Sequence, residues 1–231
     1  MKMGASMKLQ AVKKSYDLIV SLGMSCAPAI NLQRNSLRKF SMPLDWMVSY
    51  SLADVNRLYK NRFQNFMELI NLQILDETHF FLEDGIPVYP NWNKNALVKS
   101  YFIQDTLYNI ISVHDFPIHQ GKHWSTTYPS YKAKLELRIN RFWDKLITSK
   151  KTLFIRWSAS YEQAVELQSI LSGLLKPNEF IILILNPVRE ATSVQELSWN
   201  INNICVLEVP EDMNDYDSWD YILKDIQVTN N

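Results

Sequence analysis

The sequence lacks several features that would assign a function class directly. Lys and Arg together number 24, and Asp and Glu also number 24, so the formal net charge is zero. A chain without net charge has no long-range field to attract nucleic acid or an anionic membrane. It also has no apolar run long enough to cross a bilayer, and the first 15 residues contain no signal-peptide core. We therefore expect a cytoplasmic protein that binds neither nucleic acid nor membrane.

Glycine and cysteine are scarce. The chain has 5 glycines and no Gly-x-Gly-x-x-Gly pattern, which argues against a dinucleotide site. Its two cysteines, Cys26 and Cys205, are too few for a metal or disulfide framework. His119 and His123 have the i, i+4 spacing of metal ligands, but Gly121 between them argues against the helix that this spacing needs. We expect neither a metal nor another cofactor, and the oligomeric state stays open.

What the chain does contain is enough apolar sequence for one α/β domain. Hydrophobic residues make up 47% of a chain of 231 residues, which is sufficient to bury a core. Short apolar runs that alternate with helical patterns are typical of parallel strands and crossover helices. We predict a mostly parallel, doubly wound, Rossmann-like sheet of about five strands flanked by helices. The predicted strands are residues 17–22, 108–113, 152–157, 180–185 and 203–209.

Apolar residues at helical spacing predict the helices. Residues 130–147 carry a regular apolar face, and residues 160–163 form a capping box that begins a second helix. Pro177 ends that second helix. The same capping pattern at residues 193–196 predicts another helix, and residues 219–226 predict a closing one.

Residues 36–107 interrupt the alternation of strands and helices. We predict that they form an insertion after the first strand and helix, with a helix from Ser51 to about residue 69 and a hairpin around Asp84-Gly85. Residues 1–15 are predicted to be a flexible tail, and residues 16–231 a single domain that includes the insertion.

The stretch from Tyr16 to Leu32 has the pattern of a mounted nucleophile. An apolar strand is followed by Gly23, which allows a sharp turn, and by Pro28, which suits the first turn of a helix. Ser25 can cap that helix, so Cys26 lies in its first turn. The helix dipole favours negative charge there, and we expect it to bias the thiol towards the reactive thiolate. Cys26 is therefore the first candidate nucleophile.

Polar side chains at the carboxyl ends of the predicted strands supply partners for the thiol. Ligands of open α/β sheets bind beyond these ends. His114 follows the second predicted strand, and an imidazole that titrates near neutrality can accept the proton of Cys26. Asp115, Asp45 or Asn186 can orient the imidazole. Adjacent strand residues point to opposite faces, so we prefer Asp45 to Asp115 as the third catalytic group.

Asp45 and Arg156 each have a structural interpretation beside the functional one. Asp45 can pair with Arg38 while Trp46 fills the core. Arg156, at a strand end, can hold a substrate carboxylate or phosphate bidentately, or it can pair with Asp45 or Asp115. The candidate substrate-binding residues are Gly23, Ser25, Trp46, Arg156 and Asn186.

Two motifs at this separation resemble those of a known family. They are Ser21-Leu-Gly-Met-Ser-Cys26 and Leu37-Arg-Lys-Phe-Ser-Met-Pro-Leu-Asp-Trp46, and three later segments together with His114-Asp-Phe116 fit the same pattern. From about Tyr16 onward the chain resembles a bacterial family of unknown function described as putative papain-like cysteine peptidases. The resemblance implies a cysteine nucleophile and a histidine base. The later segments are Arg138–Arg141, Leu153–Arg156 and Asp217–Trp219.

Papain-like enzymes place a glutamine of the oxyanion hole six residues before the cysteine, and this chain has Val20 there. The main-chain amides of Cys26 or Ala27 can serve instead, because two amides aimed at the developing charge are sufficient.

These observations predict a cysteine-dependent acyl hydrolase or transferase, such as a peptidase, that acts on a peptide or another acyl substrate. In this hypothesis Cys26 attacks the carbonyl, His114 relays the proton, and Asp45 or Asp115 orients the imidazole.

Two alternatives use other residues. In one, Ser25 is the nucleophile of a hydrolase like the Gly-Asp-Ser esterases, although Met24 replaces their aspartate. In the other, the chain is a non-catalytic Rossmann-like module that grips a sugar or nucleotide with Arg156 and Asn186.

Overall fold

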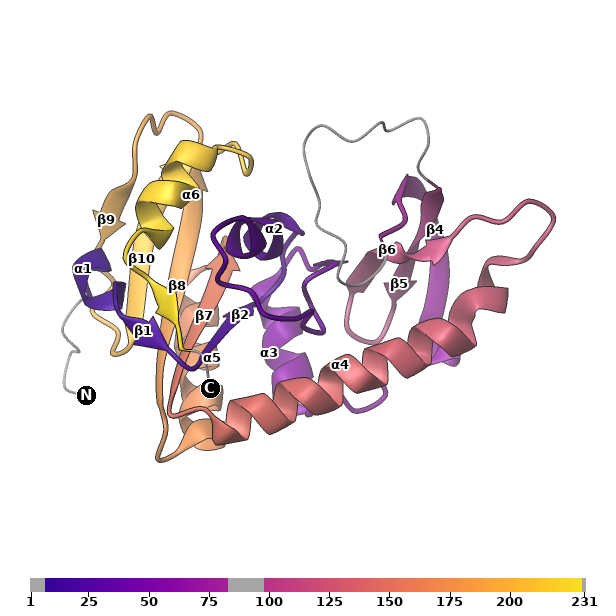
Figure 1. Ribbon diagram of the computed structural model, residues 1–231, viewed down its shortest axis with the longest axis horizontal. Helices are drawn as coiled ribbons and strands as arrows, with labels where there is room; N and C mark the ends of the chain where they lie inside the picture. The colour runs from indigo at the N-terminus through magenta and orange to yellow at the C-terminus, as the bar shows by residue number, and fades with distance from the viewer. Residues whose placement is uncertain (1–6, 83–97, 230–231) are drawn as a thin grey trace.

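The computed structural model describes residues 7–82 and 98–229, and it shows a mixed α/β protein with two main sheets (Figure 1). The turn at Asp84-Gly85 and the second strand of the predicted hairpin lie outside the described residues. None of the helices in the described ranges is long and apolar enough to cross a membrane.

The larger sheet has five strands in the order β2-β7-β8-β10-β9. The neighbouring pairs among β2, β7, β8 and β10 are parallel, and β9 is antiparallel to β10. The four parallel strands follow the chain order without a reversal, so they have no topological switch point, and the doubly wound, Rossmann-like prediction is not confirmed. The strands are β2 (Leu18–Ser21), β7 (Lys151–Trp157), β8 (Glu179–Val188), β9 (Gln195–Leu197) and β10 (Ile204–Pro210).

Helices cover both faces of this sheet, which explains why its strands are almost continuously apolar. Neighbouring residues Leu153 and Phe154 of β7 belong to the cores on opposite faces. One core includes α3 (Leu52–Lys60), α4 (Tyr128–Thr148) and α5 (Tyr161–Leu175). The other includes α1 (Leu9–Val12), α2 (Ala27–Arg34) and α6 (Tyr216–Leu223).

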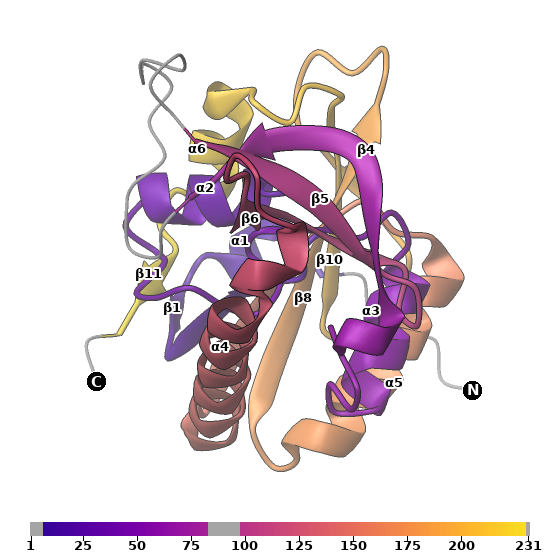
Figure 2. The ribbon, with the colours of Figure 1, turned by 90° about the vertical axis from the view of Figure 1, so that its right-hand side faces the viewer.

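The second sheet is antiparallel, with the strand order β3-β6-β5-β4, and α4 extends from the first sheet to pack against it (Figure 2). Residues 108–113 were predicted as a strand of the parallel sheet, but residues 110–113 lie in β6 of this antiparallel sheet. The apolar run at the start of β6 resembles that of a parallel strand, because nearly every residue of β6 is buried. The strands are β3 (Met47–Val48), β4 (Leu72–Phe80), β5 (Lys99–Asp105) and β6 (Ile110–Pro117).

The predicted helices α4 and α5 are confirmed, including the capping box between Ser160 and Gln163. Two other helix predictions are wrong. The helix that begins at Ser51 ends at Lys60, because positive φ angles at Arg62 and the next residue break the helical backbone. Residues 195–197 form the short edge strand β9, because their main chain pairs with β10.

The amino-terminal segment is more ordered than the predicted flexible tail. Leu9 and Val12 of α1 are buried against the larger sheet. The next element, β1 (Ser15–Tyr16), pairs with β11 (Gln227–Val228) near the other end of the chain. Residues 9–16 are therefore part of the folded domain.

Candidate active site

The turn between β2 and α2 holds Cys26 in a strained backbone. Gly23 and Met24 both have positive φ angles, 75° and 78°, and such a conformation is costly for a residue with a side chain. The Ser49 hydroxyl accepts a hydrogen bond from the Met24 N–H at 3.0 Å, and the Ser49 N–H donates to the Met24 carbonyl at 3.3 Å. A Cβ atom at Gly23 would lie 3.1 Å from Ser49 Oγ. Ser49 thus fixes the turn that presents Cys26.

Arg156 also fixes this turn, through hydrogen bonds to Leu22 and Ser49. Its Nη1 donates to the Leu22 carbonyl at 2.9 Å and to Ser49 Oγ at 2.7 Å, and its Nη2 donates to the Ser49 carbonyl at 2.7 Å. Its Nε donates to the Ser158 carbonyl at 3.1 Å, and the residue is fully buried. The predicted grip on a substrate anion is wrong, because protein oxygens already take up these donors. Arg156 anchors the Cys26 turn instead.

Cys26 lies at the N-cap of α2 and is part-buried. Burial raises the pKa of its thiol, and the carboxylates of Asp115 and Asp45 raise it further. These effects oppose the helix dipole, which is worth only about 0.3–1 kcal/mol. The prediction of a resting thiolate is therefore wrong, and Cys26 is a neutral thiol at neutral pH.

Asp45 has partners other than an imidazole. Its Oδ2 accepts hydrogen bonds from Arg38 Nε at 2.7 Å and from the Met42 N–H at 2.8 Å. Burial raises the pKa of Asp45, and the Arg38 guanidinium opposes that effect. The same guanidinium lies 4.8 Å from the ring centroid of Trp46, which fills the core. Of the two interpretations of Asp45, the structure therefore shows the ion pair with Arg38.

Asp115 is likewise held by a buried cation. Both Nη atoms of Arg138 donate to Asp115 Oδ1 at 3.2 Å, and Ser112 Oγ donates to Oδ2 at 2.8 Å. Arg138 comes from α4 and is 1% exposed. These contacts tie β6 to α4 and keep the Asp115 carboxylate in the neighbourhood of Cys26.

His114 lies in a β-bulge next to Asp115. Tyr101 of β5 pairs with Phe116 of β6, and Ile103 pairs with Ser112. Between these two pairs β5 has one residue and β6 has three. The extra residues of β6 have no direct partners on β5, and such bulges redirect side chains beside active sites. The sequence shows no signal for this bulge, since it depends on the pairing partner.

The imidazole of His114 is held in one tautomer. Its Nδ1 lies 2.6 Å from the Phe80 carbonyl oxygen. A carbonyl only accepts hydrogen bonds, so Nδ1 carries the hydrogen and Nε2 of the neutral ring keeps a lone pair. The rings of Trp46 and His79 lie edge-on to it, with centroid distances of 5.8 and 4.8 Å. The role of Phe80 could not be found from the sequence, because a main-chain carbonyl has no residue-type signal.

Burial also lowers the pKa of His114 to about 4. An unfolded chain binds a proton at its histidines near pH 6.5, so between these two values the unfolded state holds more protons and stability falls as the pH falls. The contribution is fully present above pH 6.5 and is lost as the pH falls through about 4. We expect this residue alone to cost about 3 kcal/mol of unfolding free energy between pH 7 and pH 4.

Urea denaturation at both pH values measures this loss in the wild type and in His114→Gln. The difference between the two proteins isolates His114 from the carboxylates that titrate in the same range. His119→Gln is the matched control, because His119 is exposed and should keep the wild-type pH dependence. Equal pH dependence in His114→Gln and wild type would show that His114 does not cause this loss of stability.

Ser25 and Asn186 make scaffold contacts. Ser25 Oγ donates to Met213 Sδ at 3.1 Å and accepts from the Ala27 N–H at 3.2 Å, so it supports the start of α2 while Cys26 is the N-cap residue. Asn186 Oδ1 accepts from the Ala159 N–H at 3.0 Å. Within the described part of the chain, neither side chain forms a hydrogen bond with His114.

Cys205 and the remaining histidines add no second centre. Cys205 is fully buried in β10, and burial raises its pKa to about 12. Over residues 7–82 and 98–229, no group of three or more His, Cys, Asp and Glu side chains is placed to hold a metal ion.

Comparison with known proteins places the chain in a family. Residues 17–186 match the family described as "putative papain-like cysteine peptidase (DUF1796)". The chain belongs to this family. It is also 29% identical over 213 residues to "Uncharacterized protein R408" of Acanthamoeba polyphaga mimivirus, with 87% of this chain and 92% of that protein aligned. That relative is viral, so the family is not shown to be bacterial. No solved structure matches the chain.

Proposed function

We propose that the protein is a cysteine-dependent acyl hydrolase or transferase in which Cys26 is the nucleophile and the Nε2 atom of His114 is the base. The observation that carries the proposal is the hydrogen bond from His114 Nδ1 to the Phe80 carbonyl, which leaves Nε2 able to accept a proton. Membership of a family described as cysteine peptidases supports the same chemistry.

The surroundings of the two residues overlap. Asp115 directly follows His114, and its carboxylate is near enough to Cys26 to raise the pKa of the thiol. Asp45 acts on the thiol in the same way, and its chain neighbour Trp46 contacts the His114 ring. Residues 45–46 and 114–115 therefore contribute neighbours to both the thiol and the imidazole, and this supports the proposed pairing of nucleophile and base.

The reaction begins from a neutral thiol and a neutral imidazole. Sγ of Cys26 forms a bond to the acyl carbon while the thiol proton passes to His114 Nε2. The imidazolium then gives this proton to the leaving group, and a thioester remains on Cys26. Water hydrolyses the thioester in a hydrolase, and another nucleophile takes the acyl group in a transferase.

Other groups have defined parts in this proposal. The Phe80 carbonyl orients the imidazole, in the role predicted for Asp45 or Asp115. The main-chain N–H of Cys26 stabilises the oxyanion, since the Ala27 N–H donates to Ser25 Oγ. A peptide or another acyl compound is the substrate, and the cytoplasm would keep the thiol reduced.

The alternative functions have less support. In the described part of the chain the Ser25 hydroxyl donates to the thioether of Met213 and not to a group that could act as its base. A sugar or nucleotide module would need Arg156 and Asn186, whose polar atoms bond to the protein itself.

Trapping the acyl enzyme tests the identity of the nucleophile. We expect p-nitrophenyl acetate to acetylate Cys26 as a thioester, which peptide mapping by mass spectrometry detects after acid quenching. Cys26→Ala should carry no such label, and Cys205→Ala should be labelled as fast as wild type because Cys205 is buried in β10. Labelling at Ser25, or no labelling of folded protein by this ester and by a panel of peptide thioesters, would overturn the proposal.

A further inference from the structure

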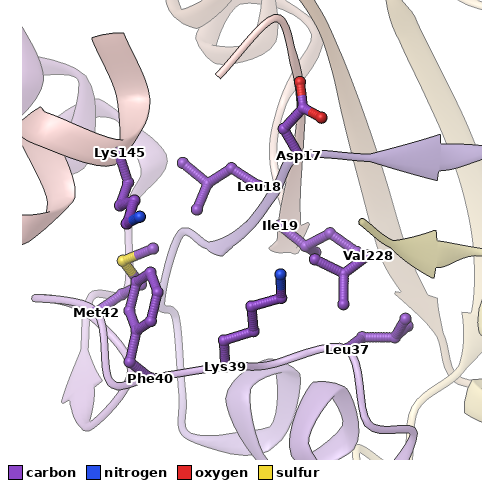
Figure 3. A pocket seen from close by; sticks show the side chains of 9 residues that line it. All are labelled: Asp17, Leu18, Ile19, Leu37, Lys39, Phe40, Met42, Lys145 and Val228. Atoms are coloured by element: carbon purple, nitrogen blue, oxygen red, sulfur yellow. The ribbon is translucent and has the colours of Figure 1, made fainter. Parts of the chain in front are cut away.

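A hollow beside the amino-terminal end of β2 has the lining of a small-molecule site (Figure 3). Its volume is about 80 Å³, and its walls include the side chains of Leu18, Ile19, Leu37 and Met42, which are otherwise buried in the core. Cys26 follows the opposite, carboxyl end of β2. The hollow is therefore separate from the candidate active site.

Two lysines border the apolar walls. Lys39 comes from the loop after α2, and Lys145 comes from the last turn of α4. Lys39 Nζ donates to the Thr229 carbonyl. Within the described ranges neither ammonium pairs with a carboxylate. Each therefore keeps its full charge available to a ligand.

A third cation adds to this local charge. Arg141 lies one turn before Lys145 on α4, and its guanidinium is 4.9 Å from the ring centroid of Phe40, another wall residue. Its Nη2 donates to the Ser41 carbonyl at 2.8 Å, and its Nε is buried without a hydrogen-bond partner. The net charge of the chain is zero, so the local excess of positive charge at the hollow results from the fold.

The carboxylate that lines the hollow does not neutralise it. Asp17 Oδ2 accepts from the N–H groups of Lys150 and Lys151 at 2.8 and 3.0 Å, and Oδ1 accepts from the Thr229 hydroxyl at 3.0 Å. Figure 3 shows this carboxylate turned away from the ammonium groups of Lys39 and Lys145. The Asp17 carboxylate is stabilised by the main-chain N–H groups of Lys150 and Lys151 at the start of β7.

We infer that the hollow binds a small oxyanion carried on a short apolar chain, either an alkyl phosphate or a short-chain carboxylate. The oxyanion lies between Lys39 and Lys145, and the alkyl chain lies against Leu18, Ile19 and Met42. Two ammonium groups that form no ion pair within the described residues suit an oxyanion. The apolar walls should strengthen binding about fourfold for each methylene that leaves water.

Methyl NMR tests this inference with three probes: n-butyl phosphate, butyrate and inorganic phosphate. We expect at least one of the two alkyl probes to shift the methyl signals of Leu18, Ile19 and Met42, and to bind at least about tenfold more tightly than inorganic phosphate. The stronger of the two identifies which oxyanion the site prefers. The double variant Lys39→Met, Lys145→Met, which keeps the apolar stems, should weaken binding at least about tenfold.

Lys60→Met is the matched control, because Lys60 is exposed in the last turn of α3 just as Lys145 lies in the last turn of α4. It should bind the probes as wild type does. Unshifted wall methyls with both alkyl probes, equal binding of inorganic phosphate, or equal weakening by Lys60→Met would each overturn the inference. Unchanged methyl signals away from the hollow show that the variants remain folded.

Discussion

Replacing Arg156 by methionine is expected to lower the free energy of unfolding by about 3–6 kcal/mol, a large part of the total of about 5–15 kcal/mol of a typical domain. The guanidinium donates to the buried carbonyls of Leu22 and Ser49 and to the part-buried carbonyl of Ser158. Each buried acceptor that loses its only donor costs about 1–3 kcal/mol, and methionine supplies none. Urea denaturation followed by circular dichroism measures the loss.

The comparison for this variant is Lys151→Met on the same strand. Lys151 is exposed at the start of β7, so its replacement should change stability by less than about 0.5 kcal/mol. Arg156→Lys should restore part of the loss, since one ammonium reaches fewer of the acceptors than a planar guanidinium does. A loss below about 1 kcal/mol in Arg156→Met would show that water satisfies these carbonyls and that Arg156 does not anchor the turn.

The parts of the fold that could be predicted from sequence are those with a local pattern. Residues 152–157 and 180–185 are mostly apolar because helices bury both faces of β7 and β8, and the helix at residues 161–175 begins with a capping box. Strand direction has no such pattern. β6 is buried to the same degree as the parallel strands, so its antiparallel pairing with β5 and β3 could not be predicted from its composition.

The local elements that carry the candidate site could be predicted from the sequence, and the interactions of its residues could not. The strand, glycine turn and helix around Cys26 are local, and the structure contains them. The thiol pKa depends on Asp45 and Asp115, which are distant in sequence and close in space. Charge follows the same rule: a net charge of zero does not show that Lys39 and Lys145 gather at one hollow.

His114→Gln is expected to slow acetylation of Cys26 by about 10²–10⁴-fold, the usual contribution of a general base. The effect is large because the thiol is neutral: burial and two carboxylates raise its pKa, so the attacking sulfur must lose its proton during the reaction. Glutamine keeps a donor for the Phe80 carbonyl but cannot accept the proton. His119→Gln, which alters an exposed imidazole, should react as wild type does.

The pH dependence of this acetylation rate, measured for wild type and His114→Gln between pH 4 and pH 8, tests most directly whether a neutral Cys26 depends on His114. We expect a wild-type rate that falls only as the pH approaches about 4, the pKa of the buried imidazole, and a His114→Gln rate that is lower throughout and rises with the fraction of thiolate. Equal rates in the two proteins, or a wild-type rate with a midpoint near the ordinary histidine pKa of about 6.5, would contradict this expectation.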